Sequence, residues 1–201
     1  FPYTTLFRSV EAESGKMIET DYVLDATGRK PNVQQIGLEK VGILFSDRGI
    51  EVDDYLRTNV KNIYASGDVI NKMIPKLTPT ATFESNYIAA HILGLNTDAI
   101  QYPPIPSVLY SLPRLSQIGV TVSEAKKDDT YIIKDIPFGR QMVFEYQNET
   151  EAEMSIVLDS QKRLVGAEIY GNDAGDLVNL LVFIINQKLT AQDLNKNIFA
   201  F

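Results

Sequence analysis

The sequence predicts two consecutive parts, an α/β segment followed by an α+β domain that is built on an antiparallel sheet. Three observations predict this order. Short apolar runs separated by turns lead to a helical stripe of apolar residues that begins at Thr78. The proline-rich segment 102–106 then interrupts every regular pattern. After it, a run of strand patterns precedes helical patterns, which is typical of an antiparallel α+β domain.

The composition limits the classes of function. The chain has 201 residues, of which 44% are hydrophobic, so it can bury a substantial core. Its formal net charge of -7 argues against nucleic acid or an anionic membrane surface as the main partner. It contains no cysteine and one histidine, His91, which disfavours thiolate and histidine-rich metal sites and Ser-His-Asp catalysis. No apolar run reaches the roughly 18 residues of a membrane span.

Residues 1–9 do not share the pattern of the rest of the chain. They resemble a translated sequencing adaptor, so we expect a non-native leader and exclude it from the fold. The chain also lacks a starting methionine, and we expect it to be a fragment of a longer protein. The first part is then the segment 10–102, and the second part is the segment 103–201.

In the first part, apolar alternation bounded by turn residues predicts short strands. These strands are expected from Val10, over 18–24, over 49–53 and around Tyr64. A short amphipathic piece is expected over 36–44. From Thr78 the apolar residues recur at helical spacing, which predicts a helix that ends at Gly94.

The second part reads as a series of strands followed by helices. Strands are expected over 108–110, 118–120, 131–136, 142–146, 152–158 and 164–170. A short helix opens at Thr121, and Thr190 with Asp193 has the spacing of a capping box that opens a last helix. The helix predicted over 174–188 is apolar nearly all round, so it needs cover on more than one side. A core position and a homodimer interface both satisfy this need.

Asp68 follows the small residues Ala65, Ser66 and Gly67 at the end of a predicted strand. Small residues let a backbone pass close to a flat or extended group. A carboxylate at the C-terminal end of a strand is a common holder of a cofactor hydroxyl. An ordinary turn is the alternative interpretation of the same residues.

Three motifs in a fixed order resemble a known family. They are Ala26-Thr27-Gly28-Arg29-Lys30-Pro31-Asn32, Ile63-Tyr64-Ala65-Ser66-Gly67-Asp68 and Leu77-Thr78-Pro79-Thr80-Ala81. With the linker and the module after it, they resemble the C-terminal part of the pyridine nucleotide-disulfide oxidoreductases, the group of glutathione reductase and dihydrolipoamide dehydrogenase. The resemblance implies that 10–102 is the C-terminal part of a Rossmann-like FAD- and NAD(P)-binding region. It also implies that 103–201 is an antiparallel-sheet dimerisation domain.

The resemblance implies FAD as the cofactor and NAD(P)H as the co-substrate. Asp68, with Gly67 beside it, would accept hydrogen bonds from the ribityl chain of FAD. Leu77, Thr78 and Ala81 would present the N-terminus of a helix to the flavin, where its partial positive charge stabilises an anion.

Gly28 is implied to act beside the cofactor site, where the chain crosses from the nicotinamide domain back to the FAD domain. We expect it to permit close backbone packing there, more as structural support than as a ligand contact. For Arg29, a role at this crossing and a plain surface charge are both open.

The implied activity is that of an FAD-dependent NAD(P)H oxidoreductase, which passes hydride through flavin to a small-molecule acceptor. We expect the chain alone to be inactive, because it contains neither a Gly-x-Gly-x-x-Gly phosphate cradle nor a cysteine pair. A non-catalytic dimerisation module and a flavin oxidoreductase without redox cysteines stay open as alternatives. We further expect a homodimer through 103–201 and a cytoplasmic location.

The C-terminal end departs from the family pattern. Many members place a His-Pro pair shortly after the final helix, where it serves as acid and base for the thiol. Phe201 stands at this place, so either the register differs by a few residues or this branch does not use the base. Because phenylalanine cannot transfer a proton, ordinary disulfide reductase chemistry is in doubt. His91 lies on the apolar stripe of a predicted helix. We interpret it as a packed or surface residue and not as a replacement for the acid and base of the His-Pro pair.

Overall fold

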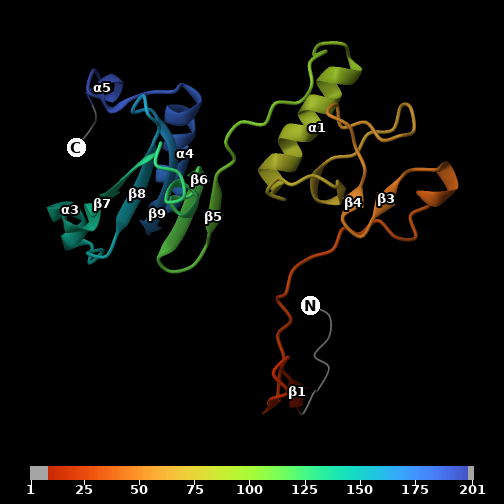
Figure 1. Cartoon of the computed structure of the whole chain (residues 1–201), viewed down its shortest axis with the longest axis horizontal. Coiled ribbons are helices and arrows are strands. Elements are labelled where there is room, and N and C mark those ends of the chain that lie inside the picture. Colours follow the sequence, from red (N-terminus) through yellow and green to blue (C-terminus); the bar gives the residue numbers. More distant parts are fainter. Residues whose placement is uncertain (1–8, 199–201) are drawn as a thin grey trace.

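The structure, a computed structural model, describes residues 9–198. Figure 1 shows a first part with one long helix and a second part with a sheet, which an extended segment joins. That segment includes residues 101–106, which have no regular secondary structure. Its three prolines fix the backbone dihedral φ and remove N–H donors, which explains the extended course.

The first part contains small hairpins, 3-10 turns and a helix. The strand pairs are β1 (Ser9–Glu11) with β2 (Met17–Glu19) and β3 (Phe45–Ser46) with β4 (Gly49–Ile50), both antiparallel. The helical elements are η1 (Glu39–Val41), η2 (Gly67–Val69) and α1 (Thr78–Ile92). The predicted start of α1 at Thr78 is confirmed, and Pro79 suits its first turn because no N–H is needed there. The helix ends before Gly94, which has a φ of +71°.

Most strands predicted for the first part are too long or wrong. Of the segment 18–24 only the end of β2 is a strand, and residues 21–30 are exposed. Of 49–53 only Gly49 and Ile50 belong to a strand, and Tyr64 makes only an isolated bridge with Arg57. The piece expected over 36–44 is helical only in η1. A strand needs hydrogen-bonded partners along its length, and the described residues supply them only for these short pieces.

The core of the first part consists of two clusters that share Val52, Ala65 and Val69. The buried members are Leu56, Ile70, Tyr87 and Ile100 in one cluster and Val33, Ile43 and Ile50 in the other. Because Val69 and Ile70 come directly after Gly67 and Asp68, this packing anchors η2 against α1.

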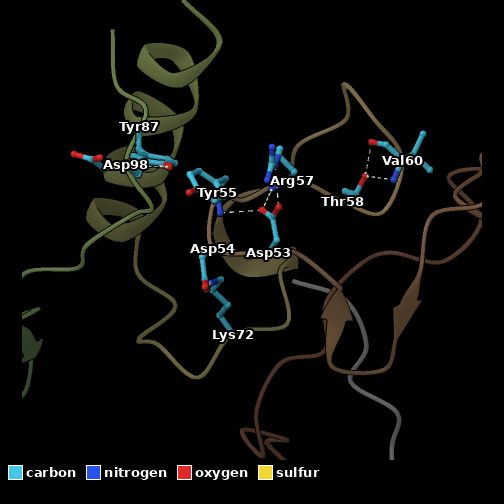
Figure 2. A network of polar contacts seen from close by, with 9 residues as sticks. All are labelled: Asp53, Asp54, Tyr55, Arg57, Thr58, Val60, Lys72, Tyr87 and Asp98. Carbon is cyan, nitrogen blue, oxygen red and sulfur yellow. Dashed lines mark hydrogen bonds and ion pairs between the residues drawn. The ribbon is translucent and has the colours of Figure 1, made fainter. Parts of the chain in front are cut away.

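Polar contacts hold the loop that precedes η2 (Figure 2). The carboxylate of Asp53 accepts hydrogen bonds from the N–H groups of Tyr55 and Arg57 at 2.8 and 2.9 Å, and from the Arg57 guanidinium at 2.8 Å. On α1, the Tyr87 hydroxyl donates to the carbonyl of Asp98 at 2.6 Å. These bonds fix the loop between β4 and η2 and the chain that leaves α1.

The second part is built on a five-stranded antiparallel sheet with the order β5-β6-β9-β8-β7. The strands are β5 (Ser107–Leu109), β6 (Arg114–Gly119), β7 (Ile132–Ile136), β8 (Glu153–Leu158) and β9 (Leu164–Gly171). The helices that match the predicted ones are α2 (Val122–Ala125), α4 (Ala174–Asn186) and α5 (Ala191–Leu194). The predicted capping box of Thr190 and Asp193 is confirmed. The α+β domain with an antiparallel sheet is therefore confirmed as well.

Helix α4 packs on β6 and β9. Ile118, Ile169 and Val178 are fully buried in the shared core, so the expected core position of α4 is confirmed. Leu180 and Phe183 on the same helix are 61% and 69% exposed. Residues 9–198 therefore cover the helix on one side and leave Leu180 and Phe183 exposed on another.

Two glycines, Gly119 and Gly166, lie opposite each other on the strands β6 and β9. A Cβ atom on Gly166 would collide with the backbone of Val120, and one on Gly119 with the carbonyl of Val165. Only glycine allows this approach, since the atoms in the way belong to the backbone of the same sheet.

The strand predicted over 142–146 is wrong, because the segment forms the helix α3 (Met142–Tyr146) after the turn η3 (Phe138–Arg140). The N–H of Phe144 donates to the carbonyl of Gln141 at 2.9 Å, which closes a turn. The Phe144 ring packs edge-on against Phe138 with 4.9 Å between the centroids. This tertiary contact overrides the alternating pattern, which by itself favours a strand.

Candidate functional site

The turn η2 packs against the first turns of α1. Gly67 has a φ of +76°, and a Cβ atom on it would lie 3.1 Å from the Cβ of Ala81. Gly67, Leu77 and Ala81 line the same narrow gap. Glycine is needed at residue 67 both for the left-handed backbone and for the close contact. The structure therefore brings three of the predicted site residues together.

Glu84 is buried behind this contact, with no exposed surface. Its carboxylate accepts a hydrogen bond from the N–H of Gly67 at 2.5 Å and another from the Tyr102 hydroxyl at 2.8 Å. Burial, and next the hydrogen bond to Glu84, raise the pKa of Tyr102 well above its usual range. Sequence reasoning missed Glu84. Its signal is an acidic residue at helical spacing between the small Ala81 and the apolar Tyr87, on the buried face of α1.

Asp68 points its carboxylate toward solvent, and 48% of its side-chain surface is exposed. The Arg29 guanidinium lies 3.2 Å from it, and the Arg29 side chain is 77% exposed. An ion pair this exposed contributes between 0 and about 1 kcal/mol to stability, so a ligand hydroxyl can replace it at little cost. Arg29, whose role sequence reasoning left open, thus lies beside Asp68.

A cavity of about 440 Å³ lies beside Asp68, and we call it the basic pocket. Its cationic lining consists of Arg29, Lys30, Arg48, Lys72 and Lys76. The Lys76 ammonium donates to the carbonyls of Asp68 and Ile70 at 2.9 and 3.0 Å. Lys76 thus holds the C-terminal side of η2, while Glu84 holds its N-terminal side.

The N-terminus of α1 carries no side-chain cap. Leu77 is the N-cap residue, and its carbonyl accepts the first helical bond from the N–H of Ala81 at 3.0 Å. The Thr80 hydroxyl is buried and has no hydrogen-bond partner in the described chain. A helix end of this kind carries partial positive charge and free N–H donors, which suit an anionic or carbonyl oxygen.

A second cavity of about 580 Å³ opens at this helix end. Leu77, Thr78 and Pro79 line it from α1, and Tyr110, Arg114 and Asp176 line it from the sheet domain. The predicted helix start thus faces a hollow that both parts of the chain enclose.

Gly28 does not show the expected close packing. A Cβ atom on Gly28 would meet nothing within 4 Å among the described residues. Its φ of +130° still favours glycine. The described residues do not supply the expected packing, because residues 21–30 run over the surface, where no other described segment covers them.

His91 is a packed residue, as expected. Its ring stacks on Tyr87 with 5.8 Å between the centroids and lies 5.3 Å from the ring of Tyr55. Its Nδ1 lies 2.9 Å from the carbonyl oxygen of Asn96. Phe201, at the place of the family's His-Pro pair, lies outside the described residues.

Residues 9–198 contain no group of His, Cys, Asp or Glu side chains that could hold a metal ion. None of their helices combines the length and the apolar character that crossing a bilayer requires.

Two family models match the chain. The model described as pyridine nucleotide-disulphide oxidoreductase matches residues 4–85, which include η2 and the first turns of α1. The model of the dimerisation domain of the same family matches residues 105–201. The first match ends before the proline-rich segment 102–106, the second begins within it, and the two follow each other in the expected order.

Curated relatives agree with these matches. The chain is 38% identical over 188 residues to a dihydrolipoyl dehydrogenase of Bacillus subtilis, which covers 92% of this chain and 39% of that protein. It is 31% identical over 195 residues to a mercuric reductase of Staphylococcus aureus, which covers 95% of this chain and 35% of that protein. The chain therefore spans about two fifths of the length of the curated relatives that it matches.

Solved structures share the fold. LpdA from Mycobacterium tuberculosis superposes with a TM-score of 0.85 at 21% identity, over 96% of this chain and 42% of that chain. The HOCl-induced flavoprotein disulfide reductase RclA from Escherichia coli gives 0.84 at 22% identity, over 96% and 44%. From the two family matches, the relatives and this common fold, the chain belongs to the pyridine nucleotide-disulphide oxidoreductases.

Proposed function

We propose that this chain functions in an FAD-dependent NAD(P)H oxidoreductase, in which bound FAD passes hydride from NAD(P)H to a small-molecule acceptor. One observation carries the proposal. The turn η2, which carries the exposed Asp68, packs against the first turns of α1, a helix whose N-terminus has no side-chain cap. The relatives named dihydrolipoyl dehydrogenase support it.

The residues present fit a flavin cofactor. A ribityl chain offers hydroxyl donors, and Asp68 is a carboxylate whose present partner, Arg29, is exposed and weakly held. The edge of a flavin ring offers carbonyl oxygens and a nitrogen, and the α1 N-terminus offers donors and positive potential. The unpartnered Thr80 hydroxyl adds a buried polar group at the same helix end.

Each residue has a defined task in the proposal. Asp68 accepts hydrogen bonds from the ribityl hydroxyls. Gly67 has no side chain, so the ribityl chain can come close to the backbone beside Asp68. Leu77, Thr78 and Ala81 form the helix start that faces the flavin ring. This placement stabilises negative charge at the ring edge, because the dipole of α1 acts there without reorganisation.

Gly28 has a lesser task. It supplies the left-handed backbone from which the neighbouring Arg29 reaches the carboxylate of Asp68. We assign residues 10–102 to the cofactor-binding region and residues 103–201 to the dimerisation domain.

The proposal includes a homodimer through 103–201. Three side chains support it, because they leave large apolar surfaces exposed: Leu109 at 63%, Leu180 at 61% and Phe183 at 69%. The family description of residues 105–201 as a dimerisation domain points the same way. The proposal also places the protein in the cytoplasm, where NAD(P)H is available.

The test uses the complete gene product, purified without added flavin. It should be yellow, and NAD(P)H should bleach its visible flavin absorption. Asp68→Ala should weaken FAD binding by roughly tenfold to a hundredfold, since a hydrogen bond to a charged group is worth about 1.5–3 kcal/mol. Asp129→Ala, at an exposed residue of the other domain, is the matched control and should leave affinity unchanged. A colourless, well-folded gene product would contradict the proposal.

A further inference from the structure

We propose that Glu84 is a positioning residue that ties the Gly67–Asp68 turn to the interdomain linker through Tyr102. One carboxylate makes both bonds, to the Gly67 N–H at 2.5 Å and to the Tyr102 hydroxyl at 2.8 Å. Gly67 precedes α1 in the sequence and Tyr102 follows it, so both hydrogen bonds join residues that are far apart along the chain. Movement of the linker is therefore transmitted to the turn that carries Asp68.

The burial of Glu84 shows how strongly this arrangement is constrained. Glu84 has no exposed surface, and no Lys, Arg or His of residues 9–198 forms an ion pair with it. A buried carboxylate without a cation is costly unless hydrogen bonds satisfy its oxygens. Each oxygen of Glu84 has one such donor, so loss of either donor leaves an unsatisfied buried acceptor.

The bond to Gly67 acts as a cap for η2. The N-cap residue Ser66 makes no side-chain cap bond, so the first N–H of the turn depends on Glu84. Lys76 holds the carbonyls at the other side of the turn. Hydrogen bonds with Glu84 and Lys76 thus hold the backbone of the turn that carries Asp68 on both of its sides.

The bond to Tyr102 connects this cap to the linker. Tyr102 directly precedes Pro103, and its ring packs against Phe83 on α1 with 5.9 Å between the centroids. Because the prolines after Tyr102 stiffen the chain, a shift of the sheet domain displaces the phenol rather than bending the linker. One consequence rests on the proposed function: the contact between Asp68 and the ribityl chain of FAD changes when the linker moves.

The first test measures the exchange of the Gly67 amide hydrogen by NMR in the full 201-residue chain, with no flavin present. Glu84→Ala should speed this exchange about tenfold or more, as loss of a hydrogen bond to a charged group predicts. Glu84→Gln keeps an acceptor oxygen in the same shape and should restore part of the protection. Asn86→Ala, at an exposed residue of the same helix, should change nothing.

The second test addresses the connection itself. Tyr102→Phe removes only the hydroxyl and should speed Gly67 exchange about threefold or more while the helical circular dichroism stays unchanged. In Glu84→Gln, the Tyr102 phenol should ionise at lower pH than in the wild type, measured by ultraviolet titration against Tyr102→Phe. These two mild variants decide the matter even if Glu84→Ala does not fold. Wild-type Gly67 exchange in both would overturn the proposal, whether or not the protein binds FAD.

Discussion

The Cβ of Ala81 lies 3.1 Å from the point where a Cβ on Gly67 would stand, so the turn η2 and the helix α1 touch at van der Waals distance. This contact brings the turn that carries Asp68 to the first turns of α1. It joins two sequence motifs that are separated by the loop from Ile70 to Lys76.

Gly67→Ala should destabilise the chain by about 2–3 kcal/mol. The left-handed backbone costs a non-glycine residue roughly 1–2 kcal/mol, and the contact with Ala81 adds to it because a helix holds Ala81 in place. Urea unfolding measures the effect. Gly42→Ala is the matched control, because Gly42 has a φ of +74° and open space around its Cβ position. Gly42→Ala should lower the free energy of unfolding only by the cost of the left-handed backbone. An equal decrease in both variants would contradict the contact between Gly67 and Ala81.

Gly166→Ala should destabilise the sheet domain by about 3 kcal/mol or more. Its Cβ would collide with the backbone of Val120, the residue directly after β6. The Val120 N–H donates to the carbonyl of Val165 on β9, so this backbone cannot shift locally without losing hydrogen bonds. Gly175→Ala, in the first turn of α4, should instead stabilise by roughly 0.5–1 kcal/mol, since its Cβ would lie 3.9 Å from Val108. Thermal unfolding of the two variants should shift in opposite directions.

Asp53→Asn should destabilise the protein at pH 7, and the difference from wild type should shrink in acid. Partial burial pushes the pKa of Asp53 up, but the N–H groups of Arg57 and Tyr55 and the Arg57 guanidinium outweigh it and lower the pKa. The folded value thus lies below the unfolded value of about 3.9. The stabilisation is present above that value and is lost as pH falls through the folded pKa. Urea unfolding from pH 7 to pH 2 tests this, and a constant difference would contradict it.

Phe183→Glu should convert the proposed homodimer into a monomer. Phe183 is 69% exposed on α4, and a twofold interface contains two copies of it, each worth roughly 1.5–3 kcal/mol when buried. The dissociation constant should therefore rise by about a hundredfold or more, measured by analytical ultracentrifugation. Leu95→Glu, at a residue that is 78% exposed in the other part, is the control and should stay dimeric. A wild-type chain that is monomeric at high concentration would contradict the interface.

Local patterns predicted the elements that depend on near neighbours. The start of α1 at Thr78 follows from Pro79 and from apolar residues at helical spacing, and the α5 capping box follows from the spacing of Thr190 and Asp193. The strands around Tyr64 and over 142–146 failed, because a strand is completed by partners that local alternation does not identify. In the second segment, the contact of Phe144 with Phe138 favoured a helix.

Local sequence is enough to predict the order of the parts, the helix starts and the motif set that contains Gly67 and Asp68, because each is encoded within a few residues. The pairing of Arg29 with Asp68, and of Glu84 with Gly67 and Tyr102, becomes visible in the folded chain. Burial and pairing depend on groups far apart along the sequence, so local patterns do not reveal them. The sequence places Glu84 in the helix but does not show whether its carboxylate is exposed or buried. Folding brings the two hydrogen-bond donors, Gly67 and Tyr102, that offset the cost of burying it.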